Sequence, residues 1–219
     1  MPVRVKICCI SSLREAEIAI AQGACAVGLV GRMPSGPGPI SDERIYEIAR
    51  RVPPGVSAFL LTLETEPGAI IRHHTATRTD TIQLVDRLQP ESYKVLRKAM
   101  PAIRLVQVVH VMNDRSVSEA LAAAEHADTI LLDSGNPDLA VKQLGGTGRT
   151  HNWDLSREIR ERVSVPVYLA GGLHPGNVKD AVQHVRPFGI DLCTGLRTNG
   201  KLDESKVKAL FNEIYSLNS

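Results

Sequence analysis

The chain has 219 residues, of which 43% are hydrophobic and 23% charged, and this usage is typical of a globular protein rather than a disordered or fibrous one. Lysine and arginine number 26 and aspartate and glutamate 24, so the net charge of +2 gives no basis for nucleic-acid or membrane-surface binding. Aromatic residues make up only 4%, which predicts an aliphatic core and leaves few rings for stacking on bases.

The four cysteines are Cys8, Cys9, Cys25 and Cys193, too few and too scattered for a disulfide framework. No Cys-x-x-Cys pair indicates a metal site. The amino-terminal residues lack the apolar segment of a signal peptide, and no apolar run approaches the ~18 residues of a membrane helix. We therefore expect a protein of the reducing cytoplasm that holds no metal.

Short β-branched runs recur along the chain, and each is followed by a segment with helical periodicity. Several runs are apolar at successive positions, which is typical of strands buried on both faces in a parallel sheet. The predicted strands are 3–7, 25–30, 56–61, 81–85, 103–109, 129–132, 167–170 and 190–193.

The segments between these strands place apolar residues at i, i+3, i+4 and i+7, the pattern of a helix with one buried face. Gly23 predicts the end of the first helix. Another helix is predicted over 65–78, with His73 and His74 on its surface. The apolar pattern is found at 45–52, 117–124, 178–185 and 207–214.

Local signals also predict where helices begin. Ser12 with Glu15, and Ser116 with Glu119, have the spacing of a capping box. Pro175 predicts a first helical position, where its missing N–H is not needed.

Eight strands alternate with about eight helices, and that pattern allows either a closed (β/α)8 barrel or an open doubly wound sheet. A doubly wound sheet usually has a glycine-rich turn after its first strand, but the sequence there is Cys-Cys-Ile-Ser. No change of composition marks a domain boundary. We therefore predict an α/β fold in which residues 1–219 form a single-domain (β/α)8 TIM barrel.

In such a barrel the functional residues lie in the loops that follow the carboxyl ends of the strands. Glycines let backbone N–H groups approach a ligand closely, and the loops after the seventh and eighth strands commonly form a phosphate site. This pattern predicts a sugar-phosphate substrate, although tight turns at the barrel rim are an alternative. The residues concerned are Gly171, Gly172, Thr194 and Gly195.

Two further loops complete the predicted site. The loop 31–39 follows the second strand, and the glycine-rich loop 145–150 is expected to contact the substrate, unless it is a flexible surface connection. The candidate binding residues in these loops are Arg32, Gly146, Thr147, Gly148 and Arg149.

Two side chains at strand ends are candidates for proton transfer. Cys8 ends the first strand, and a thiol near cations can ionise and act as a base, although a free cysteine more often only packs. Cys9 leaves open which of the two side chains faces the barrel mouth. Asp133 ends an apolar strand and suits a general acid, or else a helix cap or an ion pair.

These motifs together resemble those of one family. Lys6-Ile7-Cys8 resembles its opening Lys-Ile-Cys-Gly, and Gln-Leu at 83–84 resembles the start of its Gln-Leu-His-Gly. Leu-Asp at 132–133, followed by 145–153, is similar to its Gly-Gly-(Ser/Thr)-Gly-(Lys/Arg)-Thr-Phe-Asp-Trp signature. Leu-Ala-Gly-Gly-Leu-x-Pro-x-Asn-Val at 169–178 matches the next one. The family is phosphoribosylanthranilate isomerase of tryptophan biosynthesis, and the resemblance covers essentially the whole chain.

The resemblance implies an Amadori rearrangement without a cofactor, in which N-(5-phosphoribosyl)anthranilate, an aminoaldose phosphate, becomes an aminoketose. It implies that Cys8 removes the proton from C2 of the ribosyl group and that Asp133 protonates the furanose ring oxygen. It also implies that the backbone around Gly171, Gly172 and Gly195 holds the phosphate. Ring opening needs a proton donor and enolamine formation needs a base, so both roles are chemically reasonable.

Several positions depart from the family pattern. Cys9 stands where the family has glycine, and Arg197 stands where it usually has glutamate. The arginine expected to clamp the anthranilate carboxylate is missing from the loop after the second strand, and Arg32 can replace it only if the loop folds back. The family's His-Gly and Phe-Asp become Val-Asp at 85–86 and His-Asn at 151–152.

These departures leave three functions open: the isomerase itself, a related phosphosugar isomerase with a different aglycone, and a non-catalytic barrel that binds a phosphorylated metabolite. In each of them the partner is a small phosphosugar rather than a nucleic acid or a membrane. The chain is predicted to be a monomer or a homodimer.

Overall fold

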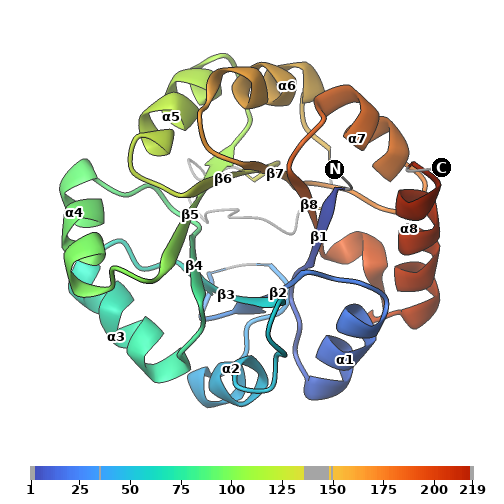
Figure 1. Cartoon of the computed structure of the whole chain (residues 1–219), viewed down its shortest axis with the longest axis horizontal. Coiled ribbons are helices and arrows are strands. Elements are labelled where there is room, and N and C mark those ends of the chain that lie inside the picture. The colour runs from blue at the N-terminus through green and yellow to red at the C-terminus, as the bar shows by residue number, and fades with distance from the viewer. Residues whose placement is uncertain (1–2, 35, 136–147, 149, 218–219) are drawn as a thin grey trace.

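The structure is a computed structural model that describes residues 3–34, 36–135, 148 and 150–217. Eight parallel strands follow one another in sequence order around a closed barrel, and β1 pairs with β8 to close it. Helices surround the barrel on its outside (Figure 1). The predicted (β/α)8 barrel is therefore confirmed.

Each predicted strand agrees with an observed strand to within one residue at either end. The barrel strands are β1 (Arg4–Ile7), β2 (Ala26–Val30), β3 (Ser57–Thr62), β4 (Thr81–Leu84), β5 (Arg104–His110), β6 (Thr129–Asp133), β7 (Val167–Leu169) and β8 (Gly189–Leu192). The helices are α1 (Leu13–Ala21), α2 (Asp42–Ala49), α3 (Pro67–Thr77), α4 (Pro90–Ala99), α5 (Arg115–Ala124), α6 (Trp153–Arg162), α7 (Val178–Val185) and α8 (Glu204–Ser216).

The helix-end predictions are partly confirmed. Ser12 caps α1 by accepting a hydrogen bond from the backbone N–H of Glu15, and Gly23 follows the end of that helix with φ +112°. The prediction at Ser116 is wrong, because α5 already begins at Arg115 and the Ser116 hydroxyl bonds to the backbone at 110 and 112 instead. The prediction at Pro175 is also wrong, since α7 begins three residues later.

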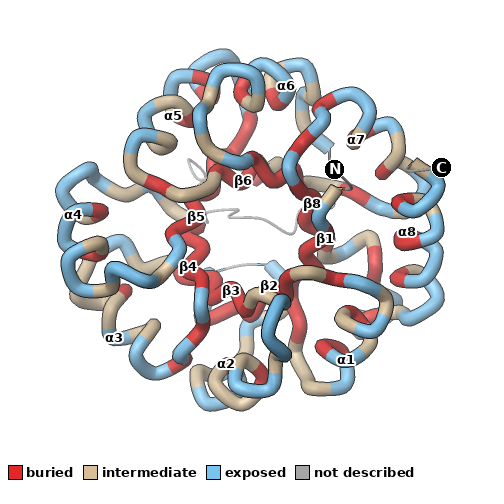
Figure 2. The backbone as a smooth tube through the Cα atoms, in the orientation of Figure 1, coloured by how far each residue is buried: buried red, intermediate tan, exposed pale blue. Residues whose placement is uncertain are grey.

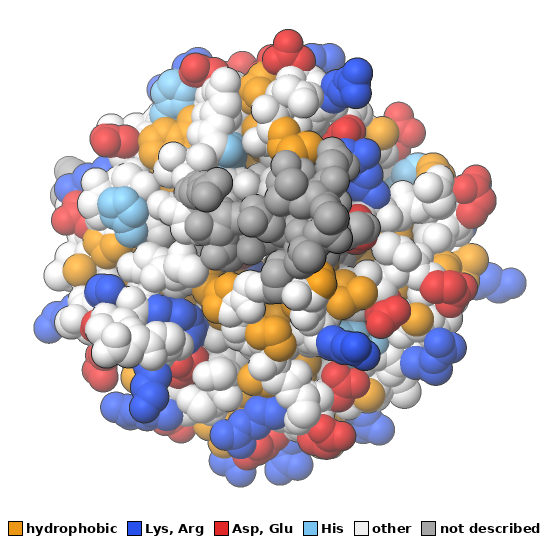
Figure 3. Space-filling model, turned by 180° about the vertical axis from the view of Figure 1, so that it is seen from behind, with side chains coloured by type: hydrophobic (Ala, Val, Ile, Leu, Met, Phe, Trp, Pro, Cys, Tyr) orange, Lys and Arg blue, Asp and Glu red, His pale blue; other side chains and the backbone are white. Residues whose placement is uncertain are grey.

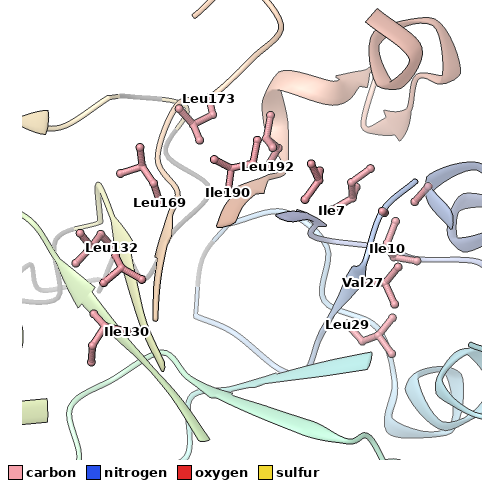
Figure 4. Packing of buried hydrophobic residues seen from close by; sticks show 14 of the residues in the cluster. Ile7, Ile10, Val27, Leu29, Ile130, Leu132, Leu169, Leu173, Ile190 and Leu192 are labelled. Carbon is pink, nitrogen blue, oxygen red and sulfur yellow. The ribbon is translucent and has the colours of Figure 1, made fainter. Parts of the chain in front are cut away.

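The core consists of two apolar layers that follow from the alternation of side chains along each strand. The outer layer lies between the barrel and the helices, and Figure 4 shows part of it, with labels on residues from Ile7 to Leu192. The inner layer fills the barrel and includes Phe59, Val108 and Tyr168. Figure 2 shows the strands as the most continuously buried part of the chain. The predicted aliphatic core is confirmed, since the outer layer is mostly Val, Ile, Leu and Ala.

Two features differ from expectation. His73 is not on the surface, because its ring lies 2.9 Å from the hydroxyl of Thr62 and 3.2 Å from the carboxylate of Asp42. After β8 the chain forms a short 3-10 turn (Thr194–Leu196) and a small hairpin of β9 (Arg197–Thr198) and β10 (Lys201–Leu202), which the sequence did not predict. No described helix is long and apolar enough to cross a membrane.

Candidate active site

A cavity lies at the carboxyl end of the barrel, where the catalytic loops of this fold are found. Figure 3 looks onto the face opposite to that of Figure 1, where hydrophobic side chains gather beside the grey atoms of residues that the structure does not describe. The lining residues include Cys9 and six residues of the predicted site: Cys8, Asp133, Gly148, Gly171, Gly172 and Thr194. The strand order therefore brings together side chains and loops that lie far apart in the sequence.

Cys8 and Cys9 both line this cavity, but their backbone conformations differ. The backbone N–H of Cys8 continues the β1–β8 ladder with a 2.7 Å hydrogen bond to the carbonyl of Leu192. Cys8 therefore shares the inward-facing side of the strand with Lys6. Cys9 has φ +61°, a left-handed conformation in which glycine is the usual residue, and its thiol lies 3.6 Å from the Pro37 carbonyl. Cys8 is the cysteine that continues the barrel wall.

The Cys8 thiol lies beside a buried cation. A Cβ at Gly28 would lie 2.7 Å from the Cys8 Sγ and 3.0 Å from the Lys6 Nζ, so both groups occupy the space over this glycine. The side-chain contact with Cys9, aided by the Lys6 charge, lowers the pKa of Cys8 although burial opposes it. The surroundings of Cys8 favour the thiolate.

Lys6 is fully buried and is held in place by an ion pair across the β1–β8 seam. Its Nζ lies 2.8 Å from Asp191 Oδ2 and 5.3 Å from the centre of the Phe59 ring. Burial acts to lower the pKa of Lys6, but the charge of Asp191 and that of the Cys8 thiolate outweigh it and raise this pKa above its ordinary value. Lys6 therefore remains an ammonium group beside the thiol.

Replacing Lys6 by methionine is expected to lower the free energy of unfolding by about 3–5 kcal/mol, because the Asp191 carboxylate then stays buried without its counterion. Urea denaturation followed by circular dichroism measures this loss. The double variant Lys6→Met with Asp191→Leu removes both charges and is expected to recover most of it. Equal stability of the single and double variants would contradict this account of the ion pair.

Asp133 is the last residue of β6 and lines the same cavity as Cys8. Around the barrel, β7 and β8 lie between β6 and β1. Its Oδ1 accepts a 2.7 Å hydrogen bond from the backbone N–H of Ser134, which fixes the carboxyl orientation. The backbone carbonyl of Asp133 accepts from Val111, so the residue is anchored at both ends. The thiol of Cys8 and the carboxyl of Asp133 therefore face one cavity from two strands.

The glycine loop after β7 has the geometry expected of an anion cradle. Gly171 and Gly172 have φ +82° and +61°, and the side chain of Asn177 holds the Gly172 carbonyl at 3.0 Å. The N–H groups of Gly171 and Gly172 donate to no acceptor among the described residues. Both groups are therefore available to an oxyanion.

The other two residues of the predicted phosphate site are Thr194, which lines the cavity, and Gly195, which is not among the described residues that line it. Thr194 lines the cavity next to Gly148, whose Cβ position would be 3.6 Å from the threonine hydroxyl. Gly195 packs so closely on the preceding loop that a Cβ there would overlap the carbonyl oxygen of Leu173. Gly195 thus lets the turn after β8 lie against the glycine loop after β7.

The predicted binding loops are only partly within the described residues. Gly148 lines the cavity, whereas Gly146, Thr147 and Arg149 lie outside the described part of the chain. Arg32 is exposed and is not among the described residues that line the cavity. The wall on that side is largely apolar and is formed by Val30, Met33, Pro37, Leu61 and Val85.

His151, which stands where the resembled family has phenylalanine, lies against the glycine loop. A Cβ at Gly171 would be 2.9 Å from its Nδ1, and its Nε2 lies 2.7 Å from the Ser156 hydroxyl. Burial lowers the pKa of His151 to about 4, although the charge of Asp133 opposes this shift. The imidazole is therefore neutral at pH 7.

Because the pKa of His151 is lower in the folded state than in the unfolded chain, the unfolded chain binds this proton first as the pH falls. The associated stability is present above about pH 6.5 and is lost between pH 6.5 and 4. His151→Phe is expected to reduce the loss in unfolding free energy between pH 7 and pH 4.5 by about 1–3 kcal/mol. Urea titrations at both pH values measure it.

The exposed His174 provides the matched control, since His174→Gln is expected to leave the difference between the two pH values unchanged. If His151→Phe loses as much unfolding free energy between pH 7 and pH 4.5 as the parent protein does, burial of His151 does not contribute to that loss.

Three polar residues of the site were missed by the sequence analysis. Lys6 and Asp191 each lie two residues before a cavity cysteine, Cys8 and Cys193, and period-2 alternation places them on the inward side of the strand. Gln83 is buried in the cavity wall, and its Oε1 has no partner among the described residues. Alternation could have found all three. Among the described residues, no group of three or more His, Cys, Asp or Glu side chains could hold a metal ion.

Comparisons with known sequences agree with this geometry. A sequence model of the family described as N-(5'-phosphoribosyl)anthranilate (PRA) isomerase matches residues 5–213. The N-(5'-phosphoribosyl)anthranilate isomerase of Methanocella arvoryzae is 31% identical over 210 residues, which are 96% of each chain. N-(5'-phosphoribosyl)anthranilate isomerase 2 of Methanosarcina mazei is 35% identical over 94% of this chain and 91% of its own length.

Solved structures give the same result. A phosphoribosylanthranilate isomerase in complex with reduced 1-(o-carboxyphenylamino)-1-deoxyribulose 5-phosphate superposes with a TM-score of 0.81 at 30% identity, over 98% of this chain and 99% of the other. The enzyme from Thermotoga maritima superposes with the same TM-score and coverage at 32% identity. A second Thermotoga maritima structure, described as monomers generated from the dimeric enzyme, has a TM-score of 0.79 at 29% identity over 98% of this chain and 99% of the other.

Proposed function

This chain belongs to the N-(5'-phosphoribosyl)anthranilate isomerase family of tryptophan biosynthesis, and we propose that Cys8 and Asp133 exchange the protons of the isomerisation. The observation that supports this proposal is that the two side chains line one cavity from β1 and β6. The favoured thiolate of Cys8 suits it to be the base, and the anchored carboxyl of Asp133 suits it to be the acid.

The first step is the opening of the furanose ring. The protonated carboxyl of Asp133 gives its proton to the ring oxygen while the bond between that oxygen and C1 breaks. The nitrogen lone pair of the anthranilate forms a double bond to C1, and the leaving oxygen departs as a neutral hydroxyl group because it has taken the Asp133 proton. Without the acid this oxygen would leave as an alkoxide, which is a poor leaving group at neutral pH.

The second step is removal of the proton on C2, which the adjacent iminium carbon makes acidic. The Cys8 thiolate takes this proton, the C–H electron pair becomes the C1–C2 double bond, and the nitrogen regains its lone pair. The Cys8 thiol then returns a proton to C1 of the enolamine while the C2 hydroxyl gives its proton to the Asp133 carboxylate, so C2 becomes the carbonyl carbon of the ketose and both side chains regain their starting forms. One thiolate and one carboxylic acid are sufficient for both transfers.

The cavity suits the two ends of the substrate differently. The N–H groups of Gly171 and Gly172 and the hydroxyl of Thr194 are proposed to hold the 5-phosphate. The apolar wall that contains Met33 and Leu61 is proposed to receive the aromatic ring. Arg32 stays a candidate partner for the anthranilate carboxylate only through a rearrangement of its loop, since its side chain is exposed.

The function is tested with the purified protein and freshly prepared N-(5'-phosphoribosyl)anthranilate, by chromatographic detection of the aminoketose. The chain is also expected to restore growth of a tryptophan auxotroph that lacks this isomerase. Turnover of only another N-glycoside of 5-phosphoribose would favour the related isomerase with a different aglycone. Stabilisation by phosphosugars without any turnover would favour the non-catalytic barrel.

The partners and the compartment follow from the same proposal. The partner is a small phosphosugar, and the chain is proposed to act as a monomer or a homodimer; a dimeric relative and its monomeric variants are both known. The four cysteines are free, which suits a reducing cytoplasm and a reaction that depends on a thiol.

A further inference from the structure

Arg197 lies in β9, beyond the last barrel strand, and makes a buried ion pair with Glu15 in the first turn of α1. Its Nη1 lies 3.1 Å from Glu15 Oε1 and its Nη2 lies 3.2 Å from Oε2, which is the two-pronged geometry of a strong guanidinium–carboxylate pair. The two side chains are 7% and 10% exposed, so water screens this pair little. The pair ties the β9–β10 hairpin to the start of α1.

The same guanidinium also holds the turn that carries the proposed base. Its Nη2 donates to the backbone carbonyl of Cys8 at 3.4 Å and, over a shorter distance, to that of Cys9. Its Nη1 further donates to the carbonyl of Gly200. One side chain thus binds the carbonyl oxygens of two successive residues, just where β1 ends and the chain turns toward α1.

This turn needs an external support because of its conformation. Cys9 has a positive φ without being glycine, so its preferred backbone conformations would turn the Cys8–Cys9 peptide differently. The carboxylate of Glu15 supports the chain two residues after Cys9 by accepting from the N–H and hydroxyl of Ser11. Together, Arg197 binds the carbonyl groups of residues 8 and 9, and Glu15 binds the N–H group of residue 11.

Arg197 does not act on the substrate directly. It is not among the described residues that line the cavity, and its hydrogen bonds go to Glu15 and to backbone carbonyls. A positive charge after β8 therefore does not make this residue a phosphate ligand.

We propose that Arg197, held by Glu15, is a positioning residue that orients the Cys8 thiol toward the substrate by binding the carbonyl oxygens of Cys8 and Cys9. The proposal rests on the proposed role of Cys8 as the base. A base placed even about 1 Å from its productive position can cost up to about a hundredfold in rate. Lysine cannot replace the guanidinium, since it lacks the planar set of donors that binds a carboxylate and two carbonyls together.

The test compares Arg197→Lys and Arg197→Met with the parent enzyme, with kcat and KM measured separately. We expect kcat to fall about tenfold for Arg197→Lys and about a hundredfold for Arg197→Met, because lysine keeps one donor group and methionine keeps none. KM is expected to change less than about threefold, since no substrate contact is lost.

Arg97 provides the matched control, because its side chain also binds one carboxylate, of Asp128, and two backbone carbonyls, at 103 and 126. It lies far from the Cys8 turn, so Arg97→Lys is expected to lower the melting temperature but to leave kcat unchanged. If Arg197→Lys also lowers only the melting temperature, the positioning role is wrong.

The charge-exchanged variant, Glu15→Arg with Arg197→Glu, keeps the proposal testable if the single variants fold poorly. It can keep an ion pair between the two positions, but a carboxylate at 197 cannot donate to the carbonyls of Cys8 and Cys9. An arginine at 15 cannot accept from the N–H groups of Ser11 and Leu202, so we expect only part of the stability to return and kcat to stay low; recovery of kcat would overturn the proposal. An active Cys8→Ala enzyme would instead refute the proposed base, whatever the Arg197 variants show.

Discussion

Cys8→Ser is expected to fold like the parent protein and to lose about 10²–10⁴-fold in kcat. The substitution exchanges sulfur for oxygen at nearly constant size, so the packing around the 7% exposed side chain is preserved. The pKa of the serine hydroxyl is far above that of the thiol, and Lys6 cannot make up the difference. The side chain at position 8 then no longer provides an anion that can take the C2 proton.

The measurement is steady-state turnover of N-(5'-phosphoribosyl)anthranilate, repeated with substrate that carries deuterium at C2. In Cys8→Ser the removal of this proton becomes the slow step, so we expect the deuterated substrate to react more slowly by a larger ratio than with the parent enzyme. The KM is expected to change little, because the glycine loop after β7 and the apolar wall are untouched.

Cys25→Ser is the matched control for this prediction. Cys25 is half-buried, and its thiol donates to the carbonyl of Val5 at 3.3 Å, near the amino end of β1 and away from the cavity. A serine hydroxyl can make the same hydrogen bond, so activity and stability are expected to remain near those of the parent. Comparable activity in both serine variants would exclude Cys8 as the base.

The barrel could be predicted from the sequence because its strands are buried on both faces. Successive apolar residues, as in β5 and β6, indicate this burial without any information on neighbours, and the predicted strand ends are correct to within one residue. Asp133 and the glycines after β7 could be identified because, in this fold, a strand end is also a position in the site.

The contacts that support these residues could not be predicted in the same way. Lys6 and Asp191 are 185 residues apart, and Arg197 and Glu15 are 182 apart. Their pairing depends on the closure of the barrel and on the β9–β10 hairpin, which has only two residues in each strand. The alternation of strands and helices predicts the closure, but it gives neither the register of β1 against β8 nor the hairpin, so the sequence identified Arg197 as a departure but not its partner.

The site is therefore built in two layers that differ in how far the sequence determines them. The proposed base, acid and phosphate cradle lie at strand ends. The charge and the orientation of the Cys8 thiol depend instead on two ion pairs outside these positions, Lys6 with Asp191 and Arg197 with Glu15. The buried ammonium of Lys6 favours the thiolate, and the guanidinium of Arg197 holds its backbone. Lys6 thus acts on the ionisation of Cys8, and Arg197 acts on its position. Substitution of Lys6 is therefore expected to change the pKa of Cys8, and substitution of Arg197 is expected to change kcat without that change in pKa.

Asp133→Asn is the second substitution with a large expected effect, a loss of about 10²–10⁴-fold in kcat. An asparagine side chain keeps the shape of the carboxyl, and its oxygen can still accept the hydrogen bond from the Ser134 N–H. It has no acidic proton to give to the ring oxygen, however, so ring opening becomes the slow step. Turnover with the C2-deuterated substrate is then expected to show a smaller isotope effect than in the parent, the opposite of Cys8→Ser.

Asp128 is the matched control for this substitution because it precedes the same strand, β6, at the opposite end of the barrel. Its carboxylate also accepts a backbone hydrogen bond, from Leu105, and pairs with Arg97. Asp128→Asn is expected to lower the melting temperature while kcat stays near the parent value. If Asp133→Asn keeps its activity, or if its isotope effect rises as in Cys8→Ser, Asp133 is not the acid that opens the ring.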